Sequence, residues 1–385
     1  MMLPLSIWLL DKVDPPAHSF VDGMLADALP ATGRTRVILL VTRSRGGRSK
    51  PYRYGRAICI PGLMPRRHLA RFINFALAWR LLARLRRHAS RRGRQAAWFV
   101  RNEPIYLAAA VCARPANVPV IYQQSYPHEQ FGSHALKRGV ARLILRVCGR
   151  RIDGLLAVSP TGLDRLRRLF PPHLPGAFIP LLASQSAPMH ATGHPLPDRP
   201  REFVYIGTHA SDRRLEVVLQ GVVLAIERGV DARVTLIGGH PQDWSRLRAV
   251  PGVVDLERRD CIRFVPPLSR DELLRRLPRY HAGLSLIPAE GIFRELSPTK
   301  LAEYLGAGLS VLASRGIPLQ ERFVTESGAG ELVDFDAASI AEGVARMAAE
   351  SADRHAQRRL SAFSYAAHQL SYRQHTKTLL TWIGR

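Results

Sequence analysis

Cysteine and long apolar runs are both scarce in this sequence of 385 residues. The four cysteines lie far apart and form no CxxC pair, standing at Cys59, Cys112, Cys148 and Cys261. This spacing argues against a disulfide framework or a zinc site and favours a reducing compartment. No uncharged apolar run reaches the roughly 18 residues of a membrane-spanning helix. The first apolar stretch follows no basic segment and ends at Asp11 and Lys12, so it predicts a buried strand rather than a signal peptide.

Acidic residues are also few: 31 Asp and Glu stand against 56 Lys and Arg, for a formal net charge of +25. A chain with this balance is attracted to polyanions such as nucleic acid, an anionic membrane surface or a phosphorylated substrate. The composition of the genome is an alternative cause, which would explain the choice of arginine over lysine but not the excess over acids.

Much of the positive charge falls on two predicted helices, residues 67–91 and 134–150. Arginines recur at helical spacing in both, at Arg80, Arg84, Arg87 and Arg91 and at Arg138, Arg142, Arg146 and Arg150. The other face of the second helix is apolar, with Leu136, Val140, Leu143, Ile144 and Val147. These helices either dock on an anionic leaflet, or pack their apolar faces on a sheet and leave the arginines solvated. Nucleic acid is a weaker candidate, because the sequence lacks aromatic stacking platforms and a DNA-reading motif.

Apolar runs alternate with helical patterns along the chain, which is typical of βα repeats that form parallel sheets covered on both faces. The first half predicts strands at residues 6–10, 36–42, 57–60, 97–101, 118–123 and 154–158. Residues 184–201 have no period and read as a linker, after which the alternation restarts. We therefore predict an α/β protein with two Rossmann-like domains, residues 1–183 and 202–365, whose parallel sheets face a central cleft.

Two glutamates in the segment 288–309, PAEGIFRELSPTKLAEYLGAGL, carry the strongest signal for chemistry. Glu295 lies in a loop before a predicted helix, and Glu303, after seven intervening residues, lies about one turn inside it. A carboxylate in the helix is placed to accept hydrogen bonds from ribose hydroxyls, and one in the loop is placed to reach a sugar on the distal phosphate. The alternative is an ordinary capped helix with two solvated glutamates.

The start of the same helix suits a phosphate. Ser297 is predicted as the N-cap and Pro298 as the first helical residue, followed by Thr299 and Lys300. The free N–H groups and the positive end of the helix dipole would hold a diphosphate.

This segment resembles the signature of the retaining GT-B glycosyltransferases of family 4, including the small-residue turn Gly306, Ala307 and Gly308. The resemblance implies the GT-B fold and a nucleotide-sugar donor, with Glu303 on the ribose and Glu295 near the donor sugar. It also implies that residues 366–385 form a last helix that crosses back to the N-terminal domain.

A second donor-binding region is predicted where a strand ends at Gly207, because glycine lets the backbone approach a ligand closely. Arg213 and Arg214 are predicted to open the next helix and to clamp a diphosphate. The family has an Arg/Lys pair here, whereas this sequence has no Lys downstream, so the two arginines must substitute. A solvated basic helix end is the alternative.

Polar residues also follow a strand of the first domain, in the segment 122–131, YQQSYPHEQF. His128 resembles the N-domain histidine of the family, which implies a contact with a sugar hydroxyl or phosphate, or a proton shuttle. A structural histidine is the alternative. The acceptor-side candidates in this segment are Gln124, Ser125 and Glu129.

Together these features predict a glycosyltransferase that moves a sugar, with retention, from a UDP- or GDP-sugar to a hydroxyl of a lipid-linked or polysaccharide acceptor in cell-surface glycan biosynthesis. We expect it in the cytoplasm, peripheral on the inner face of the membrane. Donor binding by helix N–H groups and arginines implies no metal and no other cofactor. Two alternatives stay open. One is a nucleotide-sugar epimerase, which would alter the free nucleotide-sugar; the other is a non-catalytic basic protein that binds membrane or nucleic acid in a salt-sensitive way.

Overall fold

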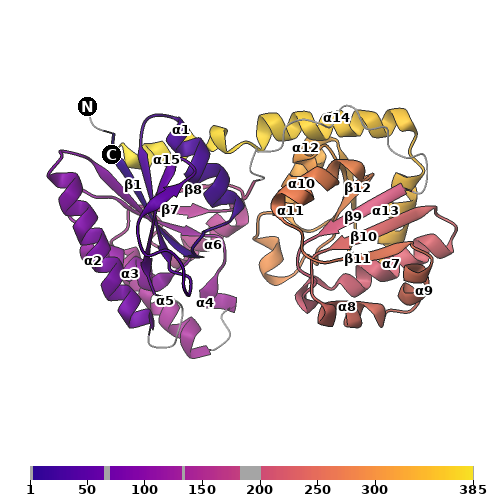
Figure 1. The fold of residues 1–385 in the computed structure, drawn as a ribbon, viewed down its shortest axis with the longest axis horizontal. Coiled ribbons are helices and arrows are strands. Elements are labelled where there is room, and N and C mark those ends of the chain that lie inside the picture. The colour runs from indigo at the N-terminus through magenta and orange to yellow at the C-terminus, as the bar shows by residue number, and fades with distance from the viewer. Residues whose placement is uncertain (1–2, 65–69, 132–134, 183–200, 385) are drawn as a thin grey trace. The chain divides into compact units, whose positions relative to one another are not determined.

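Two β-sheets form the cores of this protein. The computed structural model describes residues 3–64, 70–131, 135–182 and 201–384. Its internal contacts divide the chain into two units (Figure 1). Unit 1 comprises Met1–Ser184, Glu295–Ser297 and Tyr372–Arg385, and unit 2 comprises Gln185–Arg294 and Pro298–Ser371. The linker predicted at 184–201 lies outside the described residues except for its last position.

The sheet of unit 1 has eight strands in the order β3-β4-β2-β1-β5-β6-β7-β8. Their bounds are Leu5–Val13 (β1), Arg36–Thr42 (β2), Tyr52–Tyr54 (β3), Ala57–Leu63 (β4), Ala96–Arg101 (β5), Val120–Gln124 (β6), Gly154–Ala157 (β7) and Gly176–Phe178 (β8). Of these described strands, only β3 runs antiparallel to its neighbour. β1 pairs with β2 on one side and β5 on the other, so the carboxyl ends of β1 and β5 mark the switch point where α/β proteins bind ligands. All six predicted strands form, while β3 and β8 are too short to show a period.

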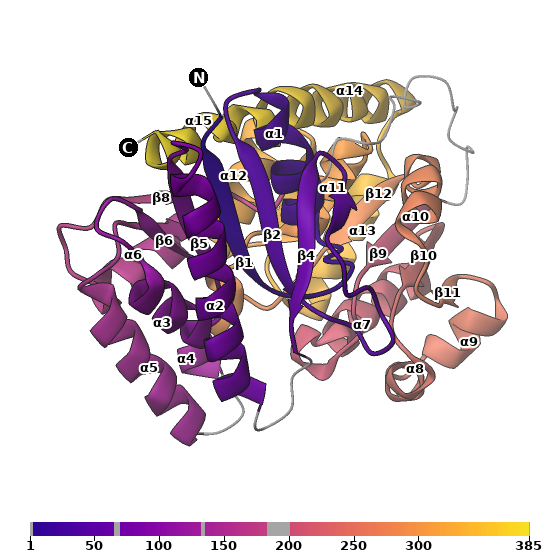
Figure 2. The same cartoon turned by 60° about the vertical axis from the view of Figure 1, so that its left-hand side comes forward.

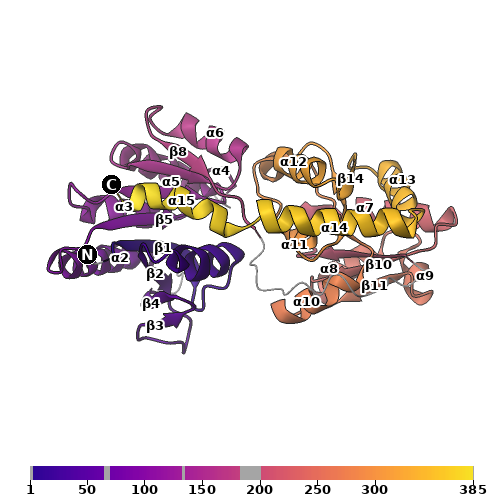
Figure 3. The ribbon, with the colours of Figure 1, turned by 90° about the horizontal axis from the view of Figure 1, so that it is seen from above.

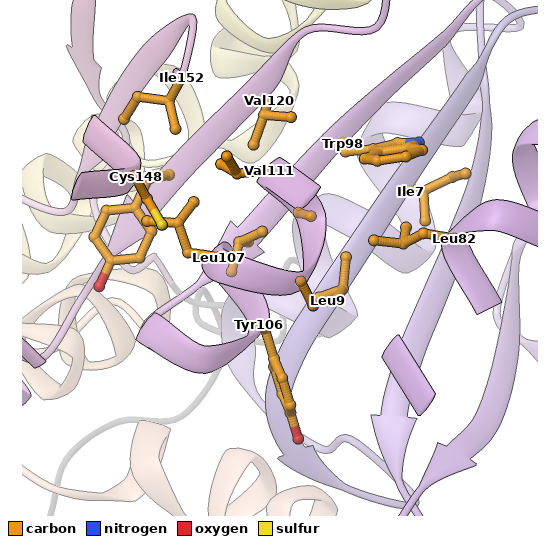
Figure 4. Packing of buried hydrophobic residues seen from close by; sticks show 14 of the residues in the cluster. Ile7, Leu9, Leu82, Trp98, Tyr106, Leu107, Val111, Val120, Cys148 and Ile152 are labelled. Carbon is orange, nitrogen blue, oxygen red and sulfur yellow. The ribbon is translucent and has the colours of Figure 1, made fainter. Parts of the chain in front are cut away.

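Helices cover both faces of this sheet. Their bounds are Leu29–Ala31 (α1), Ala70–Ser90 (α2), Pro104–Ala113 (α3), His128–Phe131 (α4), Ala135–Gly149 (α5), Pro160–Leu169 (α6) and Tyr372–Ile383 (α15). On one face α2, α3 and α5 lie side by side with α3 in the middle (Figure 2). Leu107 and Val111 of α3 pack among apolar side chains that include Ile7 and Leu9 of β1 and Leu82 of α2 (Figure 4).

The opposite face of the same sheet is rich in aromatic side chains. Trp8 and Phe99 stack with ring centres 4.3 Å apart, and Phe20 meets Trp8 edge to face. Phe20 opens a π-helical segment, Phe20–Ala28. Seven of its nine residues are buried, and the wider π turn is compatible with that packing.

The sheet of unit 2 has six parallel strands in the order β11-β10-β9-β12-β13-β14. Their bounds are Arg201–Ile206 (β9), Ala232–Ile237 (β10), Ile262–Val265 (β11), Ala282–Ser285 (β12), Ser310–Ser314 (β13) and Gly330–Val333 (β14). The helices are Leu215–Glu227 (α7), Pro241–Arg248 (α8), Val253–Arg258 (α9), Arg270–Arg276 (α10), Thr299–Gly306 (α11), Pro318–Ser327 (α12), Ala337–Ala348 (α13) and Ala352–Gln369 (α14). Parallel sheets in both units confirm the predicted α/β class.

Close packing fixes α11 against this sheet. A Cβ atom added to Gly283 of β12 would stand 2.3 Å from the Tyr304 ring, so only glycine lets the helix lie this near. The Tyr304 hydroxyl accepts a hydrogen bond from the backbone N–H of Ile206 at the end of β9. α14 packs along α11 and α12 (Figure 3). Tyr304 therefore fixes α11 to the carboxyl end of β9.

The two basic helices bury different amounts of their apolar surface. In α2, Ala78 and Leu82 are buried in the core, and its arginine stripe is exposed. In α5, Leu136, Val140, Leu143 and Val147 are exposed, and only Ile144 of the predicted apolar face packs against the core. The interpretation in which both apolar faces cover a sheet is therefore wrong for α5. No helix in the described ranges combines the length and apolar character that crossing a membrane requires.

Two buried histidines of unit 2 lie against each other. His281 precedes β12 and His355 belongs to α14, with ring centres 3.9 Å apart and exposed fractions of 1% and 2%. Burial is the main cause that lowers the pKa of His281 to about 4 and that of His355 to about 3. Both imidazoles therefore stay neutral in the folded protein over most of the acidic range.

We expect the free energy of unfolding to fall as the pH drops from about 6.5 towards 4, because unfolded histidines take up protons near pH 6.5 and the folded pair does not. Each histidine contributes a slope of about 1.4 kcal/mol per pH unit in this window. His355→Phe should remove one such slope, whereas His368→Phe, at an exposed position of the same helix, should not. Urea denaturation at several pH values checks this, and equal slopes for His355→Phe and wild type would contradict it.

Candidate functional site

The carboxyl edge of the second sheet gathers most of the predicted donor residues. β9 pairs with both β10 and β12, so the strand order reverses at this strand. Gly207 follows β9 directly with a φ of 126°, a conformation that favours glycine. A Cβ atom added to Gly238, after β10, would stand 2.2 Å from the Gly207 carbonyl oxygen, so the two turns touch through their backbones. This edge is where ligands bind in open parallel sheets.

Lys300, the second residue of α11, faces Gly207. Its Nζ lies 3.7 Å from the centre of the Tyr205 ring and would lie 3.8 Å from a Cβ atom added to Gly207. This Nζ is enclosed, and it has no hydrogen-bond partner among the residues the structure describes. Burial lowers the pKa of Lys300 well below its usual value, the charge of Arg213 lowers it further, and the charge of Glu303 opposes both.

Glu303 lies one turn further along α11, close enough to interact with Lys300. Its Oε1 accepts a hydrogen bond of 3.1 Å from Nη1 of Arg270, in α10. Burial raises the pKa of Glu303, and Arg270 and Lys300 oppose that shift. The Nε and Nη2 atoms of Arg270 are buried without a partner in the described part of the chain. A carboxylate and two cations therefore meet at one place.

Arg213 and Arg214 face different surroundings, and of the two only Arg214 lies at the helix start, in the N-cap position of α7. Arg213 ends a short 3-10 turn, and Arg214 has a left-handed backbone with a φ of 48° immediately before α7. The Arg213 guanidinium lies 4.7 Å from the centre of the Phe293 ring, and its positive charge lowers the pKa of Lys300. Arg214 forms a 3.0 Å ion pair with Glu290 at the surface. Arg213 therefore belongs to the Lys300 group and Arg214 does not.

Ser297 does not cap α11, so this prediction is wrong. The helix begins at Thr299, and Pro298 occupies the N-cap position. The Ser297 hydroxyl instead accepts the N–H of Leu181 at 2.8 Å and donates to the Leu181 carbonyl at 3.3 Å. Because the hydroxyl is used in unit 1, no side chain caps the first turn of α11.

Arg165, in α6, brings three of the predicted residues together in unit 1. Its Nη1 donates to Glu129 at 2.6 Å, its Nη2 donates to Gln124 at 2.6 Å, and its Nε donates to Glu295 at 2.5 Å. Gln124 in turn donates to Glu129 at 2.8 Å. Arg165 and Glu129 are buried, while the side chain of Glu295 is 22% exposed. One arginine thus orients the predicted catalytic carboxylate and two acceptor-side candidates.

Ser125 belongs to a second polar network, at the carboxyl ends of β1, β5 and β6. The buried Arg101 donates to Asp11 at 2.9 Å and to Ser125 at 3.0 Å. Asn102, with a φ of 62°, donates to the same two residues. The backbone of His128 begins α4, but its side chain lies outside what the structure describes.

The residues in and near these networks that were not singled out from the sequence include Arg165, Arg270, Asn102 and His209. His209 is fully buried beside Tyr205, and burial is the main cause that lowers its pKa to about 4. Arg165 falls in the helical arc of Gly162, Leu166 and Leu169, a signal for a buried arginine.

Among the described residues, no group of three or more His, Cys, Asp or Glu side chains is arranged to hold a metal ion.

A scan with family models finds no match to the sequence, and a search of curated proteins finds none either. Solved structures do match, and they are glycosyltransferases with the GT-B fold of two Rossmann-like domains. The chain therefore has the GT-B fold, which confirms the predicted fold class.

Three of these structures are similar over nearly the whole chain. Sucrose-phosphate synthase from Thermosynechococcus elongatus has 16% sequence identity and a TM-score of 0.70, with 98% of each chain covered. Trehalose-6-phosphate from E. coli, bound with UDP-2-fluoro glucose, has 12% identity and a TM-score of 0.67, again with 98% of each covered. A glycosyltransferase from Rickettsia africae has 12% identity and a TM-score of 0.70, covering 100% of this chain and 98% of its own.

Proposed function

We propose that this protein is a glycosyltransferase that moves a sugar from a UDP- or GDP-sugar to an acceptor hydroxyl. One observation carries the proposal: the enclosed ammonium of Lys300 faces Gly207 at the strand switch point, beside Arg213 and one turn from Glu303. A cation at a helix start that has no hydrogen-bond partner among the described residues suits a diphosphate. A carboxylate one turn inside the helix suits ribose hydroxyls. The similar E. coli structure, which holds a UDP-sugar analogue, supports the same donor class.

In the proposed reaction the acceptor oxygen bonds to the anomeric carbon as the bond from that carbon to the diphosphate breaks. Negative charge then grows on the departing nucleoside diphosphate. Lys300, Arg213 and the backbone N–H groups at Thr299 and the following turn would stabilise this charge, so we propose transfer without a metal. Glu303 would hold the ribose, and Arg270 would keep the carboxylate of Glu303 in position.

We assign the donor-sugar contact to Glu295, because it precedes α11 and its side chain is partly exposed. Arg165 would fix the orientation of this carboxylate. The residues proposed for the acceptor side are His128, Gln124, Ser125 and Glu129. We propose retention at the anomeric carbon and an acceptor that is lipid-linked or a polysaccharide, used in cell-surface glycan biosynthesis at the inner face of the cytoplasmic membrane.

A thermal-shift screen of the purified protein against UDP, GDP, ADP, CMP and their sugars tests the donor assignment. A ligand at 100 times its dissociation constant should stabilise the fold by about 2.7 kcal/mol, so UDP or GDP should raise the melting temperature clearly. The shift should persist in EDTA. If no nucleotide raises the melting temperature, with or without vesicles and candidate acceptors, the glycosyltransferase proposal is wrong.

Arg213 and Arg214 offer a matched pair for locating the diphosphate. Arg213→Ala should weaken binding of the nucleoside diphosphate by about 10- to 100-fold, since a hydrogen bond to a charged group is worth about 1.5–3 kcal/mol. Arg214→Ala should change the affinity by less than about twofold, because Arg214 pairs with Glu290 at the surface. Isothermal titration calorimetry measures both, and the reverse ranking would overturn the assignment of Arg213.

A further inference from the structure

An apolar stripe runs along the exposed side of α5. Its four side chains have exposed fractions of 80% for Leu136, 48% for Val140, 63% for Leu143 and 63% for Val147. They recur at intervals of three and four residues, so they share one face of the helix. Single exposed apolar residues are ordinary, but four in a row on one helix indicate a surface that is covered in use.

Positive charge borders this stripe. Arg146 and Arg150 are exposed and four residues apart, which places them along one edge of the stripe, while the exposed Arg142 one turn earlier donates its Nε–H to the Glu129 carbonyl. The sequence from 131 to 152 contains no acidic residue. In unit 2, by contrast, many arginines pair with acids, as Arg233 does with Glu202. The charge on α5 is therefore not balanced by acids on the helix itself.

The position of α5 leaves this stripe open. α5 is the outer member of the layer formed by α2, α3 and α5 (Figure 2), and its contacts with that layer are to α3. Its buried residues are Leu145, Cys148 and Gly149, which lie on the side away from the stripe. The helix is therefore anchored to unit 1 by one narrow face while the apolar face points outward.

We propose that α5 docks on an anionic lipid bilayer. Leu136, Val140, Leu143 and Val147 enter the boundary between headgroups and acyl chains, and the arginines along their edge contact anionic headgroups. This docking proposal rests on the proposed function, in which a lipid-linked acceptor lies in a bilayer. It adds which face of α5 contacts the bilayer. It assigns docking to the apolar face of α5, with the basic stripe of α2 in a supporting electrostatic role.

The charge pattern favours lipid over the other occupants. A second copy of the chain would bring the same row of arginines against this one, and two chains of formal charge +25 repel each other. Nucleic acid would attract the arginines but would gain nothing from an aliphatic stripe without aromatic rings. An anionic bilayer complements both the apolar stripe and its basic edge.

Vesicle flotation of the full chain tests the proposal. Wild type should float with phosphatidylglycerol–phosphatidylcholine vesicles, and salt should weaken the binding. Leu143→Glu/Val147→Glu should lower the partition coefficient by about tenfold or more. The matched control is Leu360→Glu in α14, because Leu360 is 61% exposed, close to the 63% of Leu143, but belongs to unit 2. Leu360→Glu should float like wild type.

Several outcomes would overturn the proposal. They are wild type that does not float, equal loss in the α5 and Leu360 variants, and a wild-type dimer in light scattering that Leu143→Glu converts to monomer. The last result would make the stripe a dimer interface. The nucleotide-induced thermal shift, measured without vesicles, should be the same in wild type and the α5 double variant. A shift that is missing in both proteins, and stays missing when vesicles and candidate acceptors are added, would defeat the glycosyltransferase proposal alone, whereas a normal shift without flotation would defeat the docking proposal alone.

Discussion

Lys300→Met is expected to remove most sugar-transfer activity and to stabilise the fold at the same time. The kcat/KM for transfer should fall by about 10²–10³-fold, the usual loss when one preorganised positive group at a developing anion is removed. The free energy of unfolding should rise by about 0.5–2 kcal/mol. Methionine keeps the length of the side chain but replaces an enclosed ammonium whose Nζ has no hydrogen-bond partner in the described part of the chain.

The opposite signs of these two effects separate a ligand-binding lysine from a structural one. A structural lysine would have its partner within the fold, and its loss would lower both stability and activity. Lys300 lies over the Tyr205 ring and beside Arg213, and burial lowers its pKa, so the free protein bears a cost that a bound diphosphate would offset. Proteins commonly keep an unfavourably buried group of this kind where a site must receive a ligand.

Two measurements check this prediction. Urea denaturation gives the free energy of unfolding, and release of the nucleoside diphosphate identified by the thermal-shift screen gives the rate. Lys377→Met, at an exposed position of α15, is the control and should change neither quantity. Normal activity in Lys300→Met would remove Lys300 from the donor site, and lower stability would show that its ammonium is satisfied within the fold.

The sequence predicted the positions of Gly207 and Glu303 relative to their strand and helix, because the signals for these elements are local. The run from an apolar strand through a loop to a helix start predicts Glu303 about one turn inside a helix, and the structure has this helix at Thr299–Gly306. Gly207 ends its strand as predicted, since alternating strands and helices fix which end of a strand meets a ligand. Capping was predicted less well, because Ser297 has a partner, Leu181, that is 116 positions away.

Ion pairs between residues that are distant in the sequence could not be predicted from the sequence. Arg165 stands beside Arg167 and Arg168 in a run of similar residues, yet it alone of the three is buried. Its partner Glu295 is 130 positions away, so no local sequence pattern indicates the pair. The same holds for Arg270 and Glu303, which are 33 positions apart.

The hydrophobic periodicity of α5 could also not predict which face of the helix packs on the core. Its pattern defines an apolar face and a basic face, but both a membrane and a sheet accept an apolar face. Only the contacts of Leu145 and Cys148 with the core decide that the wider apolar stripe points outward. The side on which a helix docks therefore depends on neighbours that its own sequence does not specify.

Arg165→Met is expected to lower the free energy of unfolding by about 3–5 kcal/mol, the range for breaking a buried ion pair by removing one partner. Glu129 is 1% exposed and would be left buried without its ion-pair partner. Gln124 would lose the donor to its Oε1, and Glu295 would lose the donor that fixes its carboxylate. The loss is large because a single guanidinium serves all three side chains.

Arg167→Met is the matched control two positions along the same helix. Arg167 pairs with Asp164 at the surface, with both side chains at least half exposed, so its loss should cost about 0–1 kcal/mol. A near-equal effect of the two substitutions would show that the Arg165 network contributes no more than a surface pair. Urea denaturation of the two variants measures the difference.

The double variant Arg165→Met/Glu129→Gln separates stability from orientation. Removing the charge of Glu129 together with that of Arg165 should recover about half of the lost stability or more, because no unpaired charge then remains buried. Donor binding by the folded protein should be retained in both the single and the double variant, since the Lys300 group lies in unit 2. The rate of transfer should stay low, because Glu295 still lacks the guanidinium that orients it. Full recovery of the rate would show that the orientation of Glu295 by Arg165 is not needed for transfer.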